Sequence, residues 1–170
     1  MTVQTILRFP DHHLRAAAQR VVVFDEDLCS LATDLLDTLR AAPAIGITAA
    51  HVGVLKRLAV IELTAADGLR TYVNPRIVWA SADMIRHEEG SVSMPGVTEE
   101  IERHARVRIS YQDMSGAEKI EEADGLLSVC LQHEVDQLDG IFWIYRLSRL
   151  KRDRVVKRFD KTQRTQAPGN

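Results

Sequence analysis

The segment from Gly125 to Leu138 most constrains what this chain can fold into. Its sequence, GLLSVCLQHEVDQL, is expected to form one long helix that ends near Gly140. Several stretches with the character of short strands, joined by turn residues, precede it. Strands in hairpins followed by a helix are typical of the α+β class. The sequence therefore predicts antiparallel β-sheets packed around a central helix, with further helices toward the N-terminus and the C-terminus.

Periodicity and turn signals predict the elements around this helix. Asp25 is a candidate N-cap for a helix that runs to about Ala41. Residues 58–63 (LAVIEL) are expected to form a buried strand. Residues 106–111 alternate polar and apolar side chains, as a half-exposed strand does, and residues 119–123 can pair back with them.

The remaining segments set the domain organisation. Residues 87–96 (HEEGSVSMPG) mix turn formers with polar residues and are predicted to form a loop. A polar helix is expected from Ser148, and it should fray after Lys161. A chain of 170 residues suits one core. We therefore expect a single domain over residues 1–162 and a flexible tail over residues 163–170.

Composition and charge argue against several classes of partner. The formal net charge of −2 gives no electrostatic reason to expect nucleic acid or anionic lipid, and the basic C-terminal segment is expected to be a solvated helix face. No apolar run approaches the roughly 18 residues of a membrane-spanning helix. Cys29 and Cys130 lie far apart and outside any C-x-x-C pair, so a reducing cytoplasm is the simplest location.

The predicted central helix carries half of a metal-binding motif. His133-Glu134 begins the pattern H-E-x-x-H, which places two imidazoles and a carboxylate on one helical face. The second imidazole should stand at position 137, where this chain has Gln. The motif is therefore H-E-x-x-Q, and a metal cannot be inferred from it alone.

Three separated segments resemble the three motifs of peptide deformylases. Residues 122–140 (EADGLLSVCLQHEVDQLDG) resemble Q-H-E-x-D-H-L-x-G with its helical lead-in. Residues 88–96 (EEGSVSMPG) resemble E-G-C-L-S, and residues 46–53 (GITAAHVG) resemble G-x-A-A-x-Q, with Thr at the first Ala. Further similarity in FPDHHLR, VNPRIV and GIFWIYRLSRLKR extends the resemblance, in the same order, over nearly the whole chain.

The resemblance implies a metal-dependent amide hydrolase. In that family the cysteine of the second motif and both histidines of the third bind a divalent metal such as iron, zinc or nickel. The glutamate beside the first histidine is the general acid/base. The glutamine of the first motif and the backbone N–H after the cysteine stabilise the developing oxyanion. The reaction removes the formyl group from the N-terminal methionine of nascent chains, which links the family to translation.

Carried over position by position, the resemblance implies a degenerate metal site. The three metal-ligand positions hold Ser91, His133 and Gln137, so two of the three ligands have changed. Glu134 occupies the position of the general acid/base, and His51 replaces the oxyanion-donor glutamine. The other positions expected in the site are the backbone N–H of Val92 and the substrate-contacting Gly46, Glu89 and Gly90.

The two replacements should weaken metal binding strongly. A serine hydroxyl is neutral where a thiolate is charged, and an amide oxygen is a weak ligand for transition metals. A metal lowers the pKa of bound water from ~15.7 to ~7, whereas Glu134 as a lone general base would supply only about 10²–10⁴-fold. We therefore expect the metal to be absent or weakly bound, and the metal-dependent activity to be lost or strongly reduced.

These changes leave alternative functions open. In the first, the pocket still binds a peptide N-terminus or a small acyl group. The plainest reading of the two replacements is that Ser91 and Gln137 hydrogen-bond to each other and to His133 and fill the volume of the lost ion. In the second, His51, His133 and Glu134 form a rebuilt metal site in a hydrolase that acts on formyl-peptides or another small amide or ester. A metal-free variant would use Ser91 as nucleophile, His133 as base and Glu134 as the acid that orients the base. This triad is weakened because His133 and Glu134 are adjacent, and adjacent side chains diverge on a helix. A third is a protein–protein role, for example at the ribosome.

Overall fold

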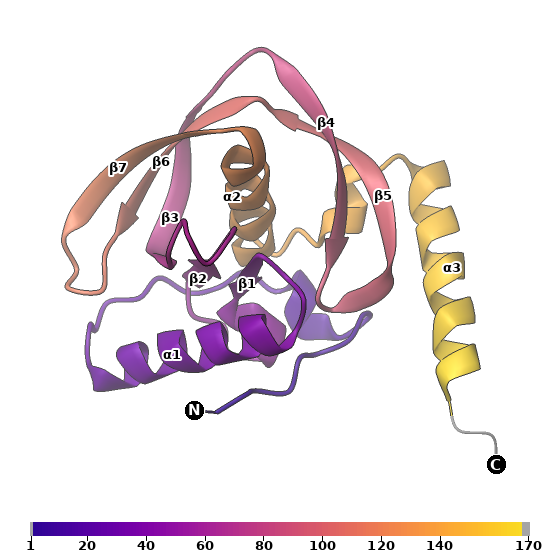
Figure 1. The fold of residues 1–170 in the computed structure, drawn as a ribbon, viewed down its shortest axis with the longest axis horizontal. Coiled ribbons are helices and arrows are strands. Elements are labelled where there is room, and N and C mark those ends of the chain that lie inside the picture. Colours follow the sequence, from indigo (N-terminus) through magenta and orange to yellow (C-terminus); the bar gives the residue numbers. More distant parts are fainter. Residues whose placement is uncertain (1, 168–170) are drawn as a thin grey trace.

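The predicted central helix is present. In the computed structural model, which describes residues 2–167, α2 spans Gly125–Leu138. Ten of its fourteen residues are buried, because α2 contacts strands of both sheets as well as the segment that follows it. Figure 1 shows α2 standing at the middle of the fold with the strands around it. The α+β prediction with a central helix is therefore confirmed.

Five strands form an antiparallel sheet along one side of α2. Their order is β1-β2-β3-β6-β7, and every neighbouring pair is antiparallel. The inner strand β2 is apolar, and all four of its residues are buried. The strands are β1 (Gly46–Thr48), β2 (Leu58–Ile61), β3 (Arg70–Ala80), β6 (Arg106–Gln112) and β7 (Glu118–Asp124).

A separate hairpin, β4 (Met84–Ser91) and β5 (Met94–His104), forms a two-stranded sheet. It contains residues 87–96, so the loop predicted there is wrong. Only one of the eight residues of β4 is buried, and its sequence therefore lacks the alternation of apolar residues by which a half-buried strand is recognised. The register shifts between Glu89 and Ser91, where the hairpin reaches its turn.

Two longer helices flank the sheets. α1 (Glu26–Ala41) begins as predicted, because the Asp25 side chain accepts a hydrogen bond from the Leu28 N–H at 3.0 Å. α3 (Arg149–Gln166) follows the cap residue Ser148 and packs on β5. The short 3-10 turns are η1 (His12–Arg15), η2 (Ala49–Val52) and η3 (Trp143–Arg146).

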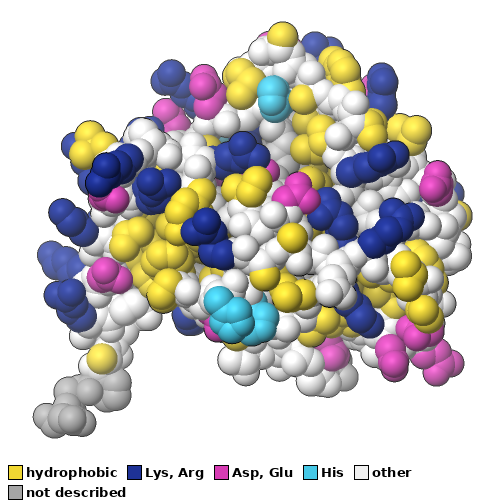
Figure 2. Space-filling view, turned by 180° about the vertical axis from the view of Figure 1, so that it is seen from behind, with side chains coloured by type: hydrophobic (Ala, Val, Ile, Leu, Met, Phe, Trp, Pro, Cys, Tyr) yellow, Lys and Arg dark blue, Asp and Glu magenta, His cyan; other side chains and the backbone are white. Residues whose placement is uncertain are grey.

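The C-terminal helix is longer than expected. It continues through Gln166, so its predicted end near Lys161 is too early, and residues 163–166 are helical. Residues 168–170 lie outside the described part of the chain, and the flexibility expected of residues 163–170 stays a prediction. The Lys and Arg side chains of α3 gather along its outer side (Figure 2). Within the described residues, no helix has the length and apolar character needed to cross a membrane.

Candidate active-site pocket

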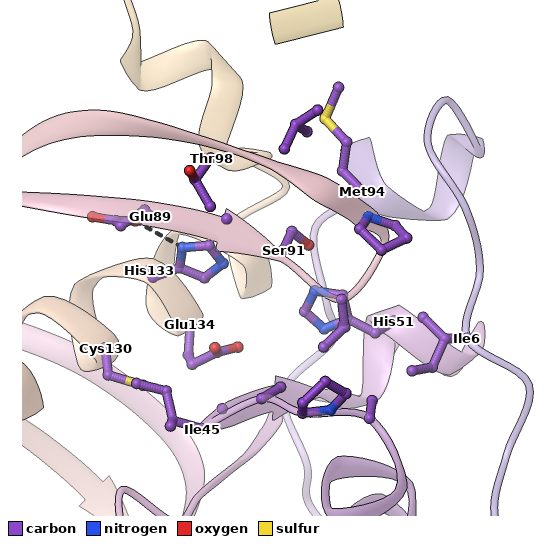
Figure 3. A pocket seen from close by; sticks show the side chains of 18 of the residues that line it. Ile6, Ile45, His51, Glu89, Ser91, Met94, Thr98, Cys130, His133 and Glu134 are labelled. Carbon is purple, nitrogen blue, oxygen red and sulfur yellow. Dashed lines mark hydrogen bonds and ion pairs between the residues drawn. The ribbon is translucent and has the colours of Figure 1, made fainter. Parts of the chain in front are cut away.

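A cavity of about 610 Å³ lies where β1, η2, the β4–β5 hairpin and α2 meet. Its volume is within the usual range for small-molecule sites, roughly 300–1,000 Å³. Figure 3 shows His51, Ser91, His133 and Glu134 around it. The lining contains all but one of the residues predicted for the site, namely Gly46, His51, Glu89, Gly90, Ser91, Val92, His133 and Glu134.

Gln137 is the exception. It lies one turn beyond His133 on α2 and is 1% exposed, but it is not part of the cavity lining. Its side-chain Nε2 donates to the backbone carbonyl of Leu14 at 2.9 Å. Its Oε1 is buried and has no hydrogen-bond partner among the described residues. The side chain at the second histidine position therefore anchors α2 to the N-terminal segment.

The hydrogen bonds predicted among Ser91, Gln137 and His133 are not formed within the described residues. The Ser91 hydroxyl oxygen accepts from the Ser93 N–H at 3.1 Å, which stabilises the turn of the hairpin. His133 Nδ1 lies 2.8 Å from Glu89 Oε1. Each of the three side chains has its own partner, so the mutual network is the wrong account of how this site is filled.

A buried chain of charged groups holds His133. Glu89 accepts two hydrogen bonds from Arg103, at 2.8 and 2.9 Å, besides its contact with His133. Arg103 also donates to Asp136 at 2.6 Å, and Arg146 donates twice to the same Asp136 carboxylate. The Glu89 carboxylate, expected to contact substrate, is thus occupied by protein partners. Arg103 and Arg146 were not predicted as part of the site, because arginines on a polar strand and after a helix have no local signature.

These contacts set the charges around His133. Burial raises the pKa of Glu89, but hydrogen bonds from Arg103 and His133 outweigh it and hold the pKa at about 2. Glu89 is therefore ionised, and His133 donates through Nδ1, which leaves Nε2 for the cavity. Burial lowers the pKa of His133, but the bond to Glu89 and the nearby Glu134 carboxylate raise it above its ordinary value.

Glu134 keeps the position of a general acid/base. It is 3% exposed, and its Oε2 has no hydrogen-bond partner among the described residues. Burial raises its pKa to about 7, so both protonation states are accessible near neutral pH. Cys130 lies one turn earlier on α2 and lines the same cavity. Burial raises the pKa of this thiol well above its ordinary value, so it acts as an apolar wall residue.

His51 is a buried residue of the cavity wall. It lies in η2, and only 1% of it is exposed. Its Nδ1 accepts a hydrogen bond from the Thr48 N–H at 3.0 Å, and the Thr48 hydroxyl lies 3.0 Å from the same nitrogen. Its Nε2 is buried without a partner in the described chain. Burial, with the nearby His133 charge, lowers the pKa of His51 to about 3, so the ring is neutral at pH 7.

Gly46 has no side chain, and the Glu134 carboxylate occupies the space that a side chain there would fill. A Cβ at this position would lie 2.5 Å from Glu134 Oε1 and 2.9 Å from Cys130 Sγ. Both distances are too short for real contacts, so a side chain here would force Glu134 to move. The backbone of β1 can therefore approach α2 closely only with glycine at this position.

The substitution Gly46→Ala is expected to destabilise the protein by about 1–3 kcal/mol, the usual cost of overpacking. Urea unfolding measures the free-energy difference. In the Glu134→Ala background the carboxylate is gone, so the same substitution should cost less. An equal cost in both backgrounds would show that the contact with Glu134 is not what excludes a side chain.

The residues present do not fit a tightly held transition metal. The three ancestral positions offer one imidazole and two neutral oxygens, and the Gln137 amide is engaged by Leu14. The rebuilt set of His51, His133 and Glu134 is not assembled either. A metal site of this kind needs three His, Cys, Asp or Glu side chains whose ligand atoms lie close together. Within residues 2–167, three such atoms lie within 4.8 Å of one another only in a surface turn, at Asp11, His12 and His13.

Comparison with known proteins places this pocket in a family context. A "Peptide deformylase-like" protein of Rhizobium meliloti is 58% identical over 170 residues, covering 99% of each chain. The same organism has a "Peptide deformylase" that is 40% identical over 168 residues, covering 97% of each. A peptide deformylase crystal structure from Legionella pneumophila matches with a TM-score of 0.92 at 36% identity, covering 99% of this chain and all of that one. The sequence model of the polypeptide deformylase family matches residues 3–153, and the chain belongs to that family.

Proposed function

We propose that this chain is a deformylase-like binding protein whose metal-dependent activity is lost or strongly reduced. The observation that carries the proposal is the position of Gln137, whose amide is bonded to the Leu14 carbonyl outside the cavity lining. With Ser91 bonded within its own turn, only His133 of the three ligand positions offers a strong ligand to the cavity.

The pocket itself supports binding. It retains the family's general acid/base position at Glu134 and an apolar wall that includes Val129 and Cys130. Two buried polar atoms in it, His51 Nε2 and Glu134 Oε2, lack partners in the described chain. Buried polar groups are usually hydrogen-bonded, so these atoms are suited to meet a ligand. We infer that the ligand is a peptide N-terminus or a small acyl group.

The relatives agree with a role distinct from ordinary deformylation. In Rhizobium meliloti the "-like" protein, with 58% identity to this chain, exists beside a "Peptide deformylase" with 40% identity. This chain is therefore more similar to the relative that the organism has in addition to its deformylase. Association with the ribosome stays a prediction.

The metal content of the purified protein tests this proposal. We expect far less than one equivalent of zinc, iron or nickel by elemental analysis. Ion held at the surface turn should disappear in the variant His12→Ala with His13→Ala, since two of its three ligands are gone. A stoichiometric ion that survives that variant but is lost with His133→Ala would overturn the proposal and favour an active, rebuilt metal site.

A further inference from the structure

The proton on His51 has a fixed place. The Thr48 backbone N–H donates to His51 Nδ1 at 3.0 Å, and a backbone N–H can only donate. Nδ1 therefore accepts and carries no proton. A neutral imidazole with a bare Nδ1 carries its proton on Nε2. The Thr48 hydroxyl lies 3.0 Å from the same nitrogen, and any hydrogen bond between them must have the hydroxyl as donor, sharing the one lone pair of Nδ1.

The protonated nitrogen is the one without a partner. His51 Nε2 is buried, and no described residue accepts a hydrogen bond from it. His51 lines the cavity across from His133 and Glu134 (Figure 3). A buried donor without a partner is destabilising, and such groups are rare in folded proteins. Because it lies at the wall of a cavity, this N–H can donate a hydrogen bond to an acceptor atom of a bound ligand.

We propose that His51 is a permanently neutral hydrogen-bond donor that recognises an acceptor oxygen of the ligand, with its tautomer fixed by the Thr48 backbone. The oxygen belongs to a carbonyl or to a carboxylate. This inference deepens the binding function proposed above and rests on it. It also explains how this chain keeps a donor in the pocket although its first motif has lost the glutamine.

The same tautomer removes His51 from the set of metal ligands. Coordination through Nε2 requires the lone pair that the proton occupies. Moving that proton to Nδ1 would set two donors, the ring N–H and the Thr48 N–H, against each other in a buried place. The rebuilt site of His51, His133 and Glu134 would then have only two ligands from this chain.

Nuclear magnetic resonance of the full chain, labelled with ¹⁵N at histidine, tests the tautomer. The variant His51→Gln identifies the His51 signals by their loss. Long-range ¹H–¹⁵N spectra at pH 7 should show the proton on Nε2, and one equivalent of Zn²⁺ should leave both His51 nitrogens unchanged. A proton on Nδ1, or a zinc-induced shift of Nε2, would overturn the inference.

Two probes separate the possible oxygens. Sodium formate offers a carboxylate, and N-formylmethionine amide offers neutral carbonyls. At least one should move the His51 Nε2–H resonance, and the probe that moves it identifies the class. His51→Leu should weaken binding of that probe roughly 3- to 10-fold, the effect of one hydrogen bond, whereas His51→Gln keeps a donor and should retain it.

The outcomes distinguish this inference from the proposed function. If a probe binds by calorimetry without moving the Nε2–H signal, recognition by His51 is refuted and the binding function stands. If the proton is on Nε2 but neither probe binds, binding of acyl groups is refuted, and recognition of an oxygen by His51 is refuted with it.

Discussion

The variant Ser91→Cys with Gln137→His is expected to bind close to one equivalent of zinc, iron or nickel, where the unmodified chain binds far less. A thiolate and a second imidazole complete the ligand set that His133 begins. The Leu14 carbonyl that now accepts from Gln137 is placed to accept the Nδ1–H of a histidine there. Metal-bound histidines usually make such a bond, and it would direct Nε2 toward the ion.

Turnover of a formyl-methionine peptide should rise with the metal. Lowering the pKa of bound water from ~15.7 to ~7 bounds the gain in hydroxide at roughly 10⁸-fold. A lone general base supplies about 10²–10⁴. We expect the variant to exceed the unmodified protein by at least about 10³-fold, measured as formate release. The variant with His12→Ala and His13→Ala added controls for metal at the surface turn.

Two results would contradict this expectation. A double variant that folds, as its circular dichroism shows, but binds no metal would mean that the pocket no longer has the family's geometry. An unmodified protein that already matches the variant in formate release would refute the loss of activity. Adding His51→Gln to the double variant is informative as well. A gain of about 10²–10³-fold is typical of restoring a missing oxyanion donor, so a much smaller gain would show that His51 Nε2–H already donates.

The central helix was predictable because its signals are local. Gly125 and Leu138 bound α2 as expected, since the turn residues around the helix and the motif within it are contiguous in the sequence. The family motifs likewise placed His51, Ser91, His133 and Glu134 in one cavity. The β4–β5 hairpin was missed because an exposed two-stranded ribbon needs no apolar alternation.

The partners of the site residues were not predictable, because they are distant in sequence. Gln137 bonds to Leu14, 123 residues away, and His133 bonds to Glu89, 44 residues away. Nothing in the helix itself specifies that an amide at position 137 finds a carbonyl outside the cavity. The tautomer of His51 is the opposite case, since its partner Thr48 is three residues away. Thr48 and His51 both differ from the first motif of the family, so the sequence could draw attention to the pair. Only the geometry shows which ring nitrogen of His51 accepts the hydrogen bond.

The substitution Arg103→Met is expected to lower the free energy of unfolding by about 3–5 kcal/mol, the cost of breaking a buried ion pair from one side. Arg103 and Glu89 each expose 5% of their side chains, so Glu89 would remain as a buried carboxylate without its guanidinium, with His133 as its remaining partner. Natural proteins are stable by only about 5–15 kcal/mol. A change of this size should therefore shift the urea midpoint strongly, and the fraction folded at 37 °C should fall.

Arg108→Met is the matched control. Arg108 also lies on a strand and pairs with a glutamate, Glu122, but these side chains are 45% and 68% exposed, so its loss should cost at most about 1 kcal/mol.

Adding Glu89→Leu to Arg103→Met removes the buried carboxylate that has lost its arginine. Asp136 still accepts hydrogen bonds from Arg146 in this double variant. The double variant should then be more stable than Arg103→Met alone, because replacing both ions is less costly than removing one. If Arg103→Met is no worse than Arg108→Met, the buried ion pair contributes no more to stability than the exposed one.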